Sequence, residues 1–188
     1  PALIRPFLLL LSVVYGLSVR ILAFFFRIKA YPLDCKVISV GNITLGGTGK
    51  TTLVEYIARY LKKEGHKVAI LTRGYKKPAI RYPLSTIRYE NMGDEPCMLA
   101  KNLQDIPVIV DKNRISGARQ AIKDYKVDTV ILDDGFQQWK IRKDLEIVTI
   151  DCTEPFGNRH LLPRGILREP ISSLKRADTF ILTKTNLK

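Results

Sequence analysis

The stretch from Lys36 to Leu53, KVISVGNITLGGTGKTTL, constrains the fold more than any other part of the chain. A short apolar run, Val37 to Val40, leads into a glycine-rich turn that ends in Gly49, Lys50 and Thr51. Apolar residues at helical spacing follow this turn. An apolar strand, a glycine turn ending in Lys-Thr and a helix form the layout of a phosphate-binding loop, because free backbone N–H groups and the positive helix N-terminus attract phosphate oxygens. The sequence therefore predicts a nucleoside triphosphate site.

The candidate nucleotide-binding residues of this loop are Thr44, Gly46, Gly47, Thr48, Gly49, Lys50, Thr51 and Thr52. Lys50 is expected to reach the β- and γ-phosphates, and the Thr51 hydroxyl to bind a magnesium ion. The usual pattern is G-x-x-x-x-G-K-[ST], and this chain has Thr44 in the place of the first glycine. The alternative is a tight glycine turn with an exposed lysine and no ligand.

Charge and cysteine content narrow the function classes. The chain has 188 residues and a formal net charge of +13, so its partner is expected to be anionic: a nucleotide, a phospholipid surface or a nucleic acid. The basic residues are dispersed and no nucleic-acid module is recognisable, so we expect no nucleic acid partner.

Cys35, Cys97 and Cys152 are odd in number and widely spaced, which favours a reducing compartment and argues against disulfides or structural zinc. The two histidines, His66 and His160, are too far apart in sequence for an imidazole metal site.

The N-terminal segment from Phe7 to Phe26 is almost wholly apolar and is interrupted by Arg20. About twenty apolar residues can span a bilayer, so one interpretation is a marginal spanning helix. The other is a helix in the membrane interface, with basic residues at the lipid phosphates: Arg5, Arg20, Arg27 and Lys29. A buried helix of a soluble protein is the third possibility. We expect residues 1–30 to form a membrane-anchoring helix, with the rest of the chain on the cytoplasmic side because basic residues follow it.

Residues 31–188 are expected to form one nucleotide-binding domain of the α/β class. Apolar, β-branched runs alternate with helical patterns, which is typical of a mostly parallel sheet covered by helices on both faces. The expected strands after the first are 67–72, 107–110, 127–132, 145–150 and 179–183. Residues 76–89 are expected to form an irregular loop or a small hairpin. Ligands of such sheets bind at the carboxyl ends of the strands, where these residues fall: Gly41, Arg73, Asp111, Asp133 and Asp151.

A second motif is VILDDGFQ at residues 130–137. An apolar strand that ends in aspartate often accompanies a phosphate-binding loop, because the carboxylate completes the coordination of magnesium. We therefore predict that one of the two aspartates binds the metal or its water while the other orients a neighbouring group, with Asp133 as the candidate metal ligand and Asp134 as the candidate catalytic residue. The alternative is that Asp133 merely ends the strand and Asp134-Gly135 forms a turn.

A third motif is Gly93-Asp94-Glu95-Pro96. Locally, Asp94 is well explained as the N-cap of a following helix. A phosphoryl-transfer enzyme nevertheless needs a carboxylate that accepts the proton of the acceptor hydroxyl. The spacing alone favours the cap over the general base.

Taken together, the motifs resemble those of the tetraacyldisaccharide 4'-kinase family, membrane-bound enzymes of lipid A synthesis in Gram-negative bacteria. The resemblance is carried, in order, by the apolar N-terminal helix, VGNITLGGTGKT, LTRGY, GDEP, ILDDGFQ and GNRHLLPRGILREPISSLKRAD. It implies ATP and magnesium as cofactors and transfer of the γ-phosphate to the 4'-hydroxyl of a lipid disaccharide 1-phosphate. It also implies an anionic membrane surface as a partner, at the cytoplasmic face of the bacterial inner membrane. No obligate protein partner is indicated.

The resemblance also implies roles for individual residues. Lys50 and Thr51 match the phosphate-loop pair, and Asp133 with Asp134 match the acidic pair. Asp94 matches the general base, which reverses the local preference for a cap. Arg168 in LREP is a candidate phosphate contact by its position in the motif.

The sequence departs from the family pattern at Thr52, where proline is frequent, and at Gln138, where histidine is common. The family also continues beyond TKTN (183–186), into a C-terminal part expected to carry a histidine that partners the base.

Two rival functions share the phosphate-loop motif. A membrane-bound ATPase switch of the partitioning type often has a lysine just before the two glycines, and this chain has Leu45 there. A GTP-binding trafficking protein would need a base-recognition motif such as Asn-Lys-x-Asp, to which TKTN is a poor match. The kinase is therefore the prediction, and the partitioning-type ATPase is the alternative.

Overall fold

A computed structural model of the chain describes residues 4–73 and 94–187. Its centre is a six-stranded sheet in the order β3-β2-β4-β1-β5-β6, in which every pairing is parallel. The strands are β1 (Lys36–Gly41), β2 (Val68–Thr72), β3 (Val108–Val110), β4 (Thr129–Asp133), β5 (Leu145–Asp151) and β6 (Thr179–Thr183). The predicted α/β class is confirmed, and each strand lies where the apolar runs place it. The loop or hairpin expected at 76–89 lies outside the described residues.

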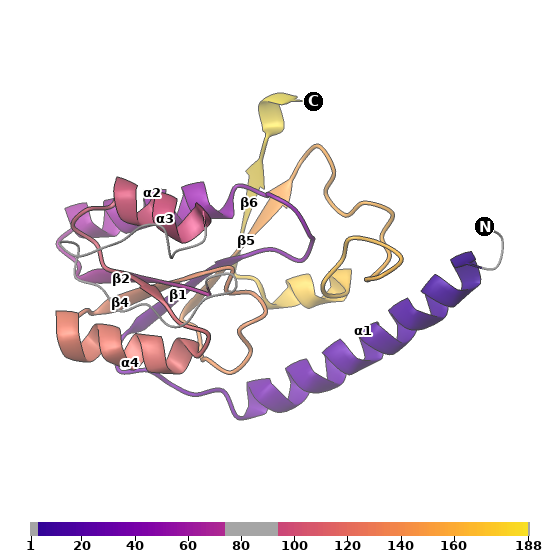
Figure 1. Ribbon diagram of the computed structural model, residues 1–188, viewed down its shortest axis with the longest axis horizontal. Coiled ribbons are helices and arrows are strands. Elements are labelled where there is room, and N and C mark those ends of the chain that lie inside the picture. Colours follow the sequence, from indigo (N-terminus) through magenta and orange to yellow (C-terminus); the bar gives the residue numbers. More distant parts are fainter. Residues whose placement is uncertain (1–3, 74–93, 188) are drawn as a thin grey trace.

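Helices cover both faces of this sheet (Figure 1). Helices α2 (Lys50–Lys63) and α3 (Asp94–Asn102) pack on one face, where Val54, Ala58 and Leu99 are fully buried against the strands. Helix α4 (Arg114–Tyr125) packs on the other face through Ala118 and Ala121. Because successive side chains of a strand point to opposite faces, β-strands buried on both faces read as continuous apolar runs.

Local signals define the helix ends. Gly65 follows α2 with a φ of +91°, the left-handed conformation that glycine adopts at no steric cost, and it stops the helix as the sequence predicts. The side chain of Asn113 caps α4 by accepting hydrogen bonds from the N–H groups of Ile115 and Ser116 at 3.2 and 3.3 Å. These caps satisfy backbone groups that a helix cannot satisfy internally.

The strand order places the phosphate-binding loop at the centre of the carboxyl edge of the sheet. β1 lies between β4 and β5, and Val40 near the end of β1 is paired with Asp133 at the end of β4. The chain runs from β1 toward β2 on one side and later crosses from β4 to β5 on the other. Such a reversal of direction opens a crevice at the carboxyl ends of the strands, which is where open α/β sheets bind ligands.

The long segment between β5 and β6 packs on the phosphate-binding loop. Leu167 of this segment packs in a small apolar core with Ile43, Phe136 and Val148. The backbone of Leu45 donates to the carbonyl of Ile166 at 2.8 Å, and that of Arg168 donates to the carbonyl of Ile43 at 2.7 Å. The segment ends in a short 3₁₀ helix, η3 (Ile171–Arg176), and a second one, η4 (Thr185–Leu187), follows β6.

The N-terminal helix α1 (Ile4–Ile28) extends away from the sheet, with the chain terminus at its far end (Figure 1). Within the described residues it is the one helix long and apolar enough to cross a membrane, which by itself is weak evidence of membrane association. Its buried residues are all small or medium in size: Ser12, Gly16, Val19 and Ala23. Most of its large apolar side chains, from Phe7 to Ile28, are exposed. One narrow stripe of α1 thus contacts the domain, and the rest of its surface is uncovered.

Candidate active site

The phosphate-binding loop has the backbone conformation that its glycines predict. Gly46 and Gly49 have φ angles of +104° and +75°, and Gly49 lies immediately before α2. Thr44, which replaces the first glycine of the usual pattern, has no positive φ. Its buried hydroxyl accepts a hydrogen bond from Asn42 Nδ2 at 3.2 Å. The departure from the pattern therefore causes no backbone strain, because this position does not need the conformational freedom of glycine.

The phosphate-binding loop is hydrogen-bonded to the sheet on one side and has free space on the other. The Thr48 hydroxyl lies 2.7 Å from the Thr149 hydroxyl, and the Thr48 carbonyl accepts a bond from Thr183 Oγ1 at 3.2 Å. Thr48 therefore joins the loop to β5 and β6, and its side chain points into the sheet. A Cβ atom added at Gly46 or Gly47 would meet no atom within 4 Å. The space over the two glycines can therefore receive a phosphate group, as the motif predicts.

Lys50 is the first residue of α2, and its ammonium group lies among oxygen atoms of the site. Its Nζ atom is 3.3 Å from Asn42 Oδ1 and 3.7 Å from Asp134 Oδ1. The side chain is only 15% exposed, so its charge is held inside the crevice. The next residue, Thr51, is half-buried in the first turn of the same helix, and Thr52 is exposed.

Asp134 is held in place by Arg168. Arg168 donates to both carboxylate oxygens of Asp134, at 2.8 and 2.7 Å, and also to the side-chain oxygen of Asn42. Burial acts to raise the pKa of Asp134, but the hydrogen bonds and positive charge of Arg168, followed by Lys50, outweigh it and lower the pKa. Asp134 itself has a φ of +53°, an uncommon conformation for a residue with a side chain. The turn thus points a stably ionised carboxylate toward Lys50.

Asp133 has the opposite electrostatic character. Its side chain is 2% exposed, and burial, together with the negative charges of Glu95 and Asp134, raises its pKa to about 6, although Lys50 and Arg114 act to lower it. A buried carboxylate with a raised pKa is poised to bind a cation, which compensates its charge. No group of three or more acidic, histidine or cysteine residues in 4–73 and 94–187 is arranged to hold a metal ion by itself. Magnesium at nucleotide sites commonly takes one or two protein oxygens plus phosphates, so Asp133 and Thr51 fit this chemistry.

Two glycines allow the acidic turn to approach β1. A Cβ atom at Gly41 would lie 2.5 Å from the backbone nitrogen of Phe136, and one at Gly135 would lie 2.5 Å from Ser39 Oγ. Either methyl group would push the turn away from the strand. The two glycines therefore set the distance between the acidic pair and the phosphate-binding loop.

Comparisons with known proteins agree with this geometry. Residues 4–188 match the sequence profile of the family described as Tetraacyldisaccharide-1-P 4'-kinase. The chain belongs to this family. It is 42% identical to the tetraacyldisaccharide 4'-kinase of Syntrophotalea carbinolica and 40% identical to that of Elusimicrobium minutum, in each case over 97% of this chain. The alignments cover 54% and 52% of those two proteins, so the chain spans about half their length.

A solved structure supports the same family assignment. LpxK from Aquifex aeolicus in complex with ATP superposes with a TM-score of 0.88 at 35% identity. The superposition covers 98% of this chain and 60% of the Aquifex chain. The family resemblance predicted from the motifs is thereby confirmed, together with the fold.

The site also contains two residues that the sequence motifs do not indicate, Arg114 and Asn42. Arg114 is 3% exposed and donates to the carbonyls of Asp111 at 3.2 Å and Asp133 at 3.1 Å. It therefore ties the ends of β3 and β4 together beneath the acidic pair, and burial lowers its pKa to about 10. The sequence does contain a signal for Arg114, because it begins a helix, where a positive charge opposes the helix dipole.

Asn42 accepts hydrogen bonds from Lys50 and Arg168. In the sequence, an asparagine before a glycine turn cannot be distinguished from an ordinary turn residue.

A buried carboxylate supports the segment that carries Arg168. Glu169 is fully buried and accepts bonds from Gln137 at 3.1 Å, Trp139 at 3.3 Å and Arg176 at 2.7 Å. Gln137 also donates to the Asn42 carbonyl at 3.0 Å. The acidic turn, the phosphate-binding loop and the segment after β5 are thus linked into one hydrogen-bonded unit.

Asp94, the predicted general base, is exposed and is the first residue of α3. Gly93, the residue before it, lies outside the described residues. Among the described residues, neither a hydrogen bond nor an ion pair joins Asp94 to Lys50 or Asp134. Its neighbour Glu95 is near enough to raise the pKa of Asp133, which places the first turn of α3 beside the site. The role of Asp94 therefore stays a prediction.

Two further pockets differ in their relation to this site. The first, about 600 Å³, is lined by the end of α1, the residue after β2, the start of α4 with the two residues before it, and the loop 137–141 that follows β4. Its residues include Phe26, Arg73, Arg114, Trp139 and Lys140.

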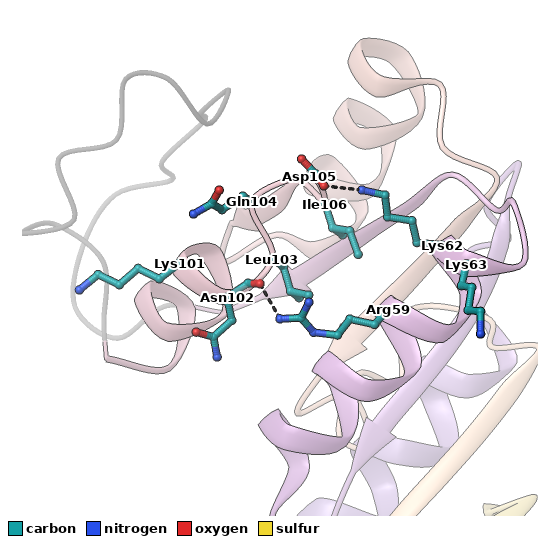
Figure 2. A pocket seen from close by; sticks show the side chains of 9 residues that line it. All are labelled: Arg59, Lys62, Lys63, Lys101, Asn102, Leu103, Gln104, Asp105 and Ile106. Carbon is teal, nitrogen blue, oxygen red and sulfur yellow. Dashed lines mark hydrogen bonds and ion pairs between the residues drawn. The ribbon is translucent and has the colours of Figure 1, made fainter.

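The second pocket is shown in Figure 2 and lies between the C-terminal end of α2 and the loop after α3. Because α2 begins at the carboxyl edge of the sheet and runs back, this pocket is at the opposite edge. Two of its cations already have partners, since Lys62 is 2.9 Å from Asp105 and Arg59 donates to the Asn102 carbonyl at 2.6 Å. Its position separates it from the phosphate-binding loop.

Proposed function

We propose that the protein is an ATP-dependent lipid kinase, which transfers the γ-phosphate of ATP to the 4'-hydroxyl of a tetraacylated glucosamine disaccharide 1-phosphate in lipid A biosynthesis. The observation that carries the proposal is the convergence of Lys50, Asp133, Asp134 and Arg168 at the carboxyl edge of the sheet in a member of the 4'-kinase family. The proposal concerns the full-length protein, because the chain covers only about half of its relatives. Residues 31–188 would form the kinase domain and residues 1–30 its membrane anchor.

The phosphate-binding loop would hold the nucleotide. A Cβ at Gly46 or Gly47 would meet open space, and α2 begins directly after the loop, so the backbone N–H groups of residues 46–51 and the N-terminus of α2 would surround the β-phosphate. Lys50 is held by Asn42 and Asp134 at distances of 3.3 and 3.7 Å and would turn from these oxygens to the phosphates. Thr51 and Asp133 would hold magnesium, which neutralises charge on the phosphates when it is bound. Arg168 keeps Asp134 ionised and fixed.

Asp94 would accept the proton of the acceptor hydroxyl. Phosphoryl transfer depends mainly on positioning and on compensation of charge, and a general base contributes a further factor. The first turn of α3 is beside the acidic pair, and Asp94 is exposed to a ligand that arrives from solution or from the membrane. Its carboxylate is thus free to receive a proton while Asp133 and Asp134 are occupied with cations.

The pocket of about 600 Å³ would receive the disaccharide. Arg73, Lys112 and Lys140 supply positive charge, and Trp139 supplies an aromatic surface, which suits a sugar that carries phosphate. Phe26 at the end of α1 forms part of its wall, so the apolar helix and the polar pocket are continuous. A lipid with its acyl chains in the membrane and its head group in this pocket would satisfy both surfaces.

We infer that α1 lies in the interface of the inner membrane at the cytoplasmic face. Its buried stripe, Ser12 to Ala23, contacts the domain over roughly 17 Å of helix at 1.5 Å per residue. A helix that packs on a water-exposed domain over that length cannot have the same residues in the hydrocarbon core. The exposed apolar side chains on its other faces suit partial immersion instead.

The direct test is mass spectrometry of the product formed by the full-length protein from ATP and the lipid disaccharide 1-phosphate. We expect one added phosphate on the lipid, and we expect Lys50→Ala to lower the rate by at least about 10²-fold, since the loop lysine stabilises the transferred group. Tyr60→Phe changes an exposed residue of α2 away from the site and is the control for nonspecific effects of substitution, so it should keep the wild-type rate. Hydrolysis of ATP without lipid phosphorylation would instead support the ATPase switch.

A further inference from the structure

The N-terminal helix makes specific polar contacts that a membrane anchor does not require. The Tyr15 hydroxyl donates to the backbone carbonyl of Arg168 at 3.0 Å. Ser12, which is 4% exposed, has its hydroxyl 2.9 Å from the carbonyl of Leu161 and accepts a bond from the N–H of Arg164 at 3.1 Å. All of these partners belong to the segment between β5 and β6 that carries Arg168.

The packing of α1 on this segment is close. A Cβ atom at Gly16 would lie 2.4 Å from Leu161 Cδ1, so glycine lets the helix backbone approach the leucine. Leu161 packs in turn on the core formed by Ile43, Phe136 and Leu167. On the opposite side of the helix Val14 is 55% exposed. The helix therefore directs its small and polar residues to the domain and its large apolar residues away from it.

A short series of hydrogen bonds joins Tyr15 to the phosphate-binding loop. Tyr15 bonds the carbonyl of Arg168, and the guanidinium of Arg168 bonds Asp134 and Asn42. Asn42 accepts a bond from Lys50 at 3.3 Å. On its other side, the Arg168 backbone N–H donates to Ile43 at 2.7 Å. The backbone of Arg168 is thus held from the nucleotide loop through its N–H and from α1 through its carbonyl.

We propose that Tyr15 is a positioning residue for the kinase reaction, which holds the backbone of Arg168 so that its guanidinium meets Asp134 and Asn42 in productive geometry. This inference rests on the proposed function. It gives α1 a second role, because the docked helix completes the catalytic geometry as well as binding the membrane. Displacement of a charged group by about 1 Å can lower a rate substantially, so one hydrogen bond at this backbone matters.

The first test is Tyr15→Phe in the full-length enzyme, which keeps the ring and removes the hydroxyl. We expect kcat to fall about three- to tenfold, the worth of one hydrogen bond. The KM for ATP should change less than twofold, and cosedimentation with anionic vesicles should be unchanged. Tyr60→Phe, the same change at an exposed position of α2, is the matched control and should match the wild type. Wild-type kcat in Tyr15→Phe would overturn the proposal.

A double-mutant cycle shows whether Tyr15 acts through Arg168. Arg168→Lys keeps the charge and removes the two-pronged contact with Asp134. In that background Tyr15→Phe should cost less than twofold in kcat, because the group that it positions is gone. An equal loss in both backgrounds would assign Tyr15 a general structural role and contradict the proposal.

A second variant separates positioning from anchoring. Gly16→Leu adds apolar surface but places side-chain atoms where Leu161 lies, so α1 must move away from the segment. We expect vesicle binding to be kept and kcat to fall at least as far as in Tyr15→Phe. Val14→Leu, on the exposed side of the helix, is the control and should have wild-type kcat. Equal kcat for the two variants would contradict the proposal.

The last test does not depend on kinase activity. The ¹⁵N side-chain Nε–H resonance of Arg168 can be assigned in detergent-solubilised full-length protein as the signal that Arg168→Lys removes. We expect this resonance to shift in Tyr15→Phe and to stay in place in Tyr60→Phe. If the wild type phosphorylates no lipid, the proposed function fails, and the resonance still decides the coupling. An unmoved resonance in Tyr15→Phe overturns it.

Discussion

Adjacent aspartates at the end of β4 illustrate how position sets the chemistry of identical side chains. Asp134 is half-exposed and paired with Arg168, so its pKa is lowered. Asp133 is buried one residue earlier, and its pKa is raised to about 6. One carboxylate is therefore a fixed negative charge, and the other gains most from a bound cation. The sequence motif alone does not show this difference in pKa.

The raised pKa of Asp133 predicts a pH dependence of stability in metal-free protein. The unfolded carboxyl ionises near 3.8 and the folded one near 6, so the folded state binds the proton more tightly between these values. The free energy of unfolding should therefore fall as pH rises from about 4 to about 6 and then stay level, with a contribution of up to about 3 kcal/mol. Asp133→Asn should lack this component and be more stable than the wild type at pH 7.5. Urea unfolding in EDTA measures it, and parallel pH curves for the two proteins would contradict it.

A second prediction at the residue scale separates the general base from the metal ligand. Asp94→Asn keeps the size of the side chain and removes the basic oxygen, so single-turnover rate should fall by roughly 10²–10⁴ with little change in MgATP affinity. Asp133→Asn should instead raise the magnesium concentration needed for half-maximal rate. Both require the full-length enzyme, with affinity and rate measured separately. If Asp94→Asn weakens magnesium binding and leaves the saturated rate intact, the two roles are reversed.

At the scale of elements, the contact between β1 and the acidic turn depends on glycine. Gly41→Ala would place a methyl group 2.5 Å from backbone nitrogen of Phe136, which cannot yield as a side chain can, so we expect a loss of about 1–3 kcal/mol in unfolding free energy. Gly47→Ala is the matched control, because a Cβ there meets nothing within 4 Å. It should leave stability unchanged and weaken ATP binding, since it fills the space over the loop. Urea unfolding and nucleotide titration compare the two, and equal stability losses would contradict the prediction.

How much of this architecture the sequence predicts depends on whether the signal is local. The β-branched runs and the glycine turn give the parallel sheet and place Lys50 and Asp133 at one edge, because carboxyl ends of parallel strands share that edge. The contact of Arg168 with Asp134 spans 34 residues of chain and follows no periodicity, so the motif position suggested a phosphate contact and not this ion pair. Likewise, Tyr15 reads as one more apolar-helix residue until the fold brings it to Arg168.

At the scale of the whole molecule, attachment to membranes combines apolar surface with net charge. Deleting residues 1–28 removes three arginines, so the net charge of this 188-residue chain falls from +13 to +10 and remains strongly positive. The truncated protein should still bind anionic vesicles at low salt, because the remaining basic surface attracts them. At about 0.15 M salt, where charges are screened within about 8 Å, it should be released, whereas the full-length protein stays bound through α1.

Cosedimentation with vesicles of anionic and of neutral lipids, each at low and physiological salt, measures this. Arg20→Gln in the full-length protein is the control for charge, because it removes one exposed cation of α1 and keeps its apolar faces. That variant should remain bound to anionic vesicles at physiological salt. If the truncated protein also remains bound under those conditions, the attachment is electrostatic or lies outside α1, and the apolar faces that α1 exposes need a different partner.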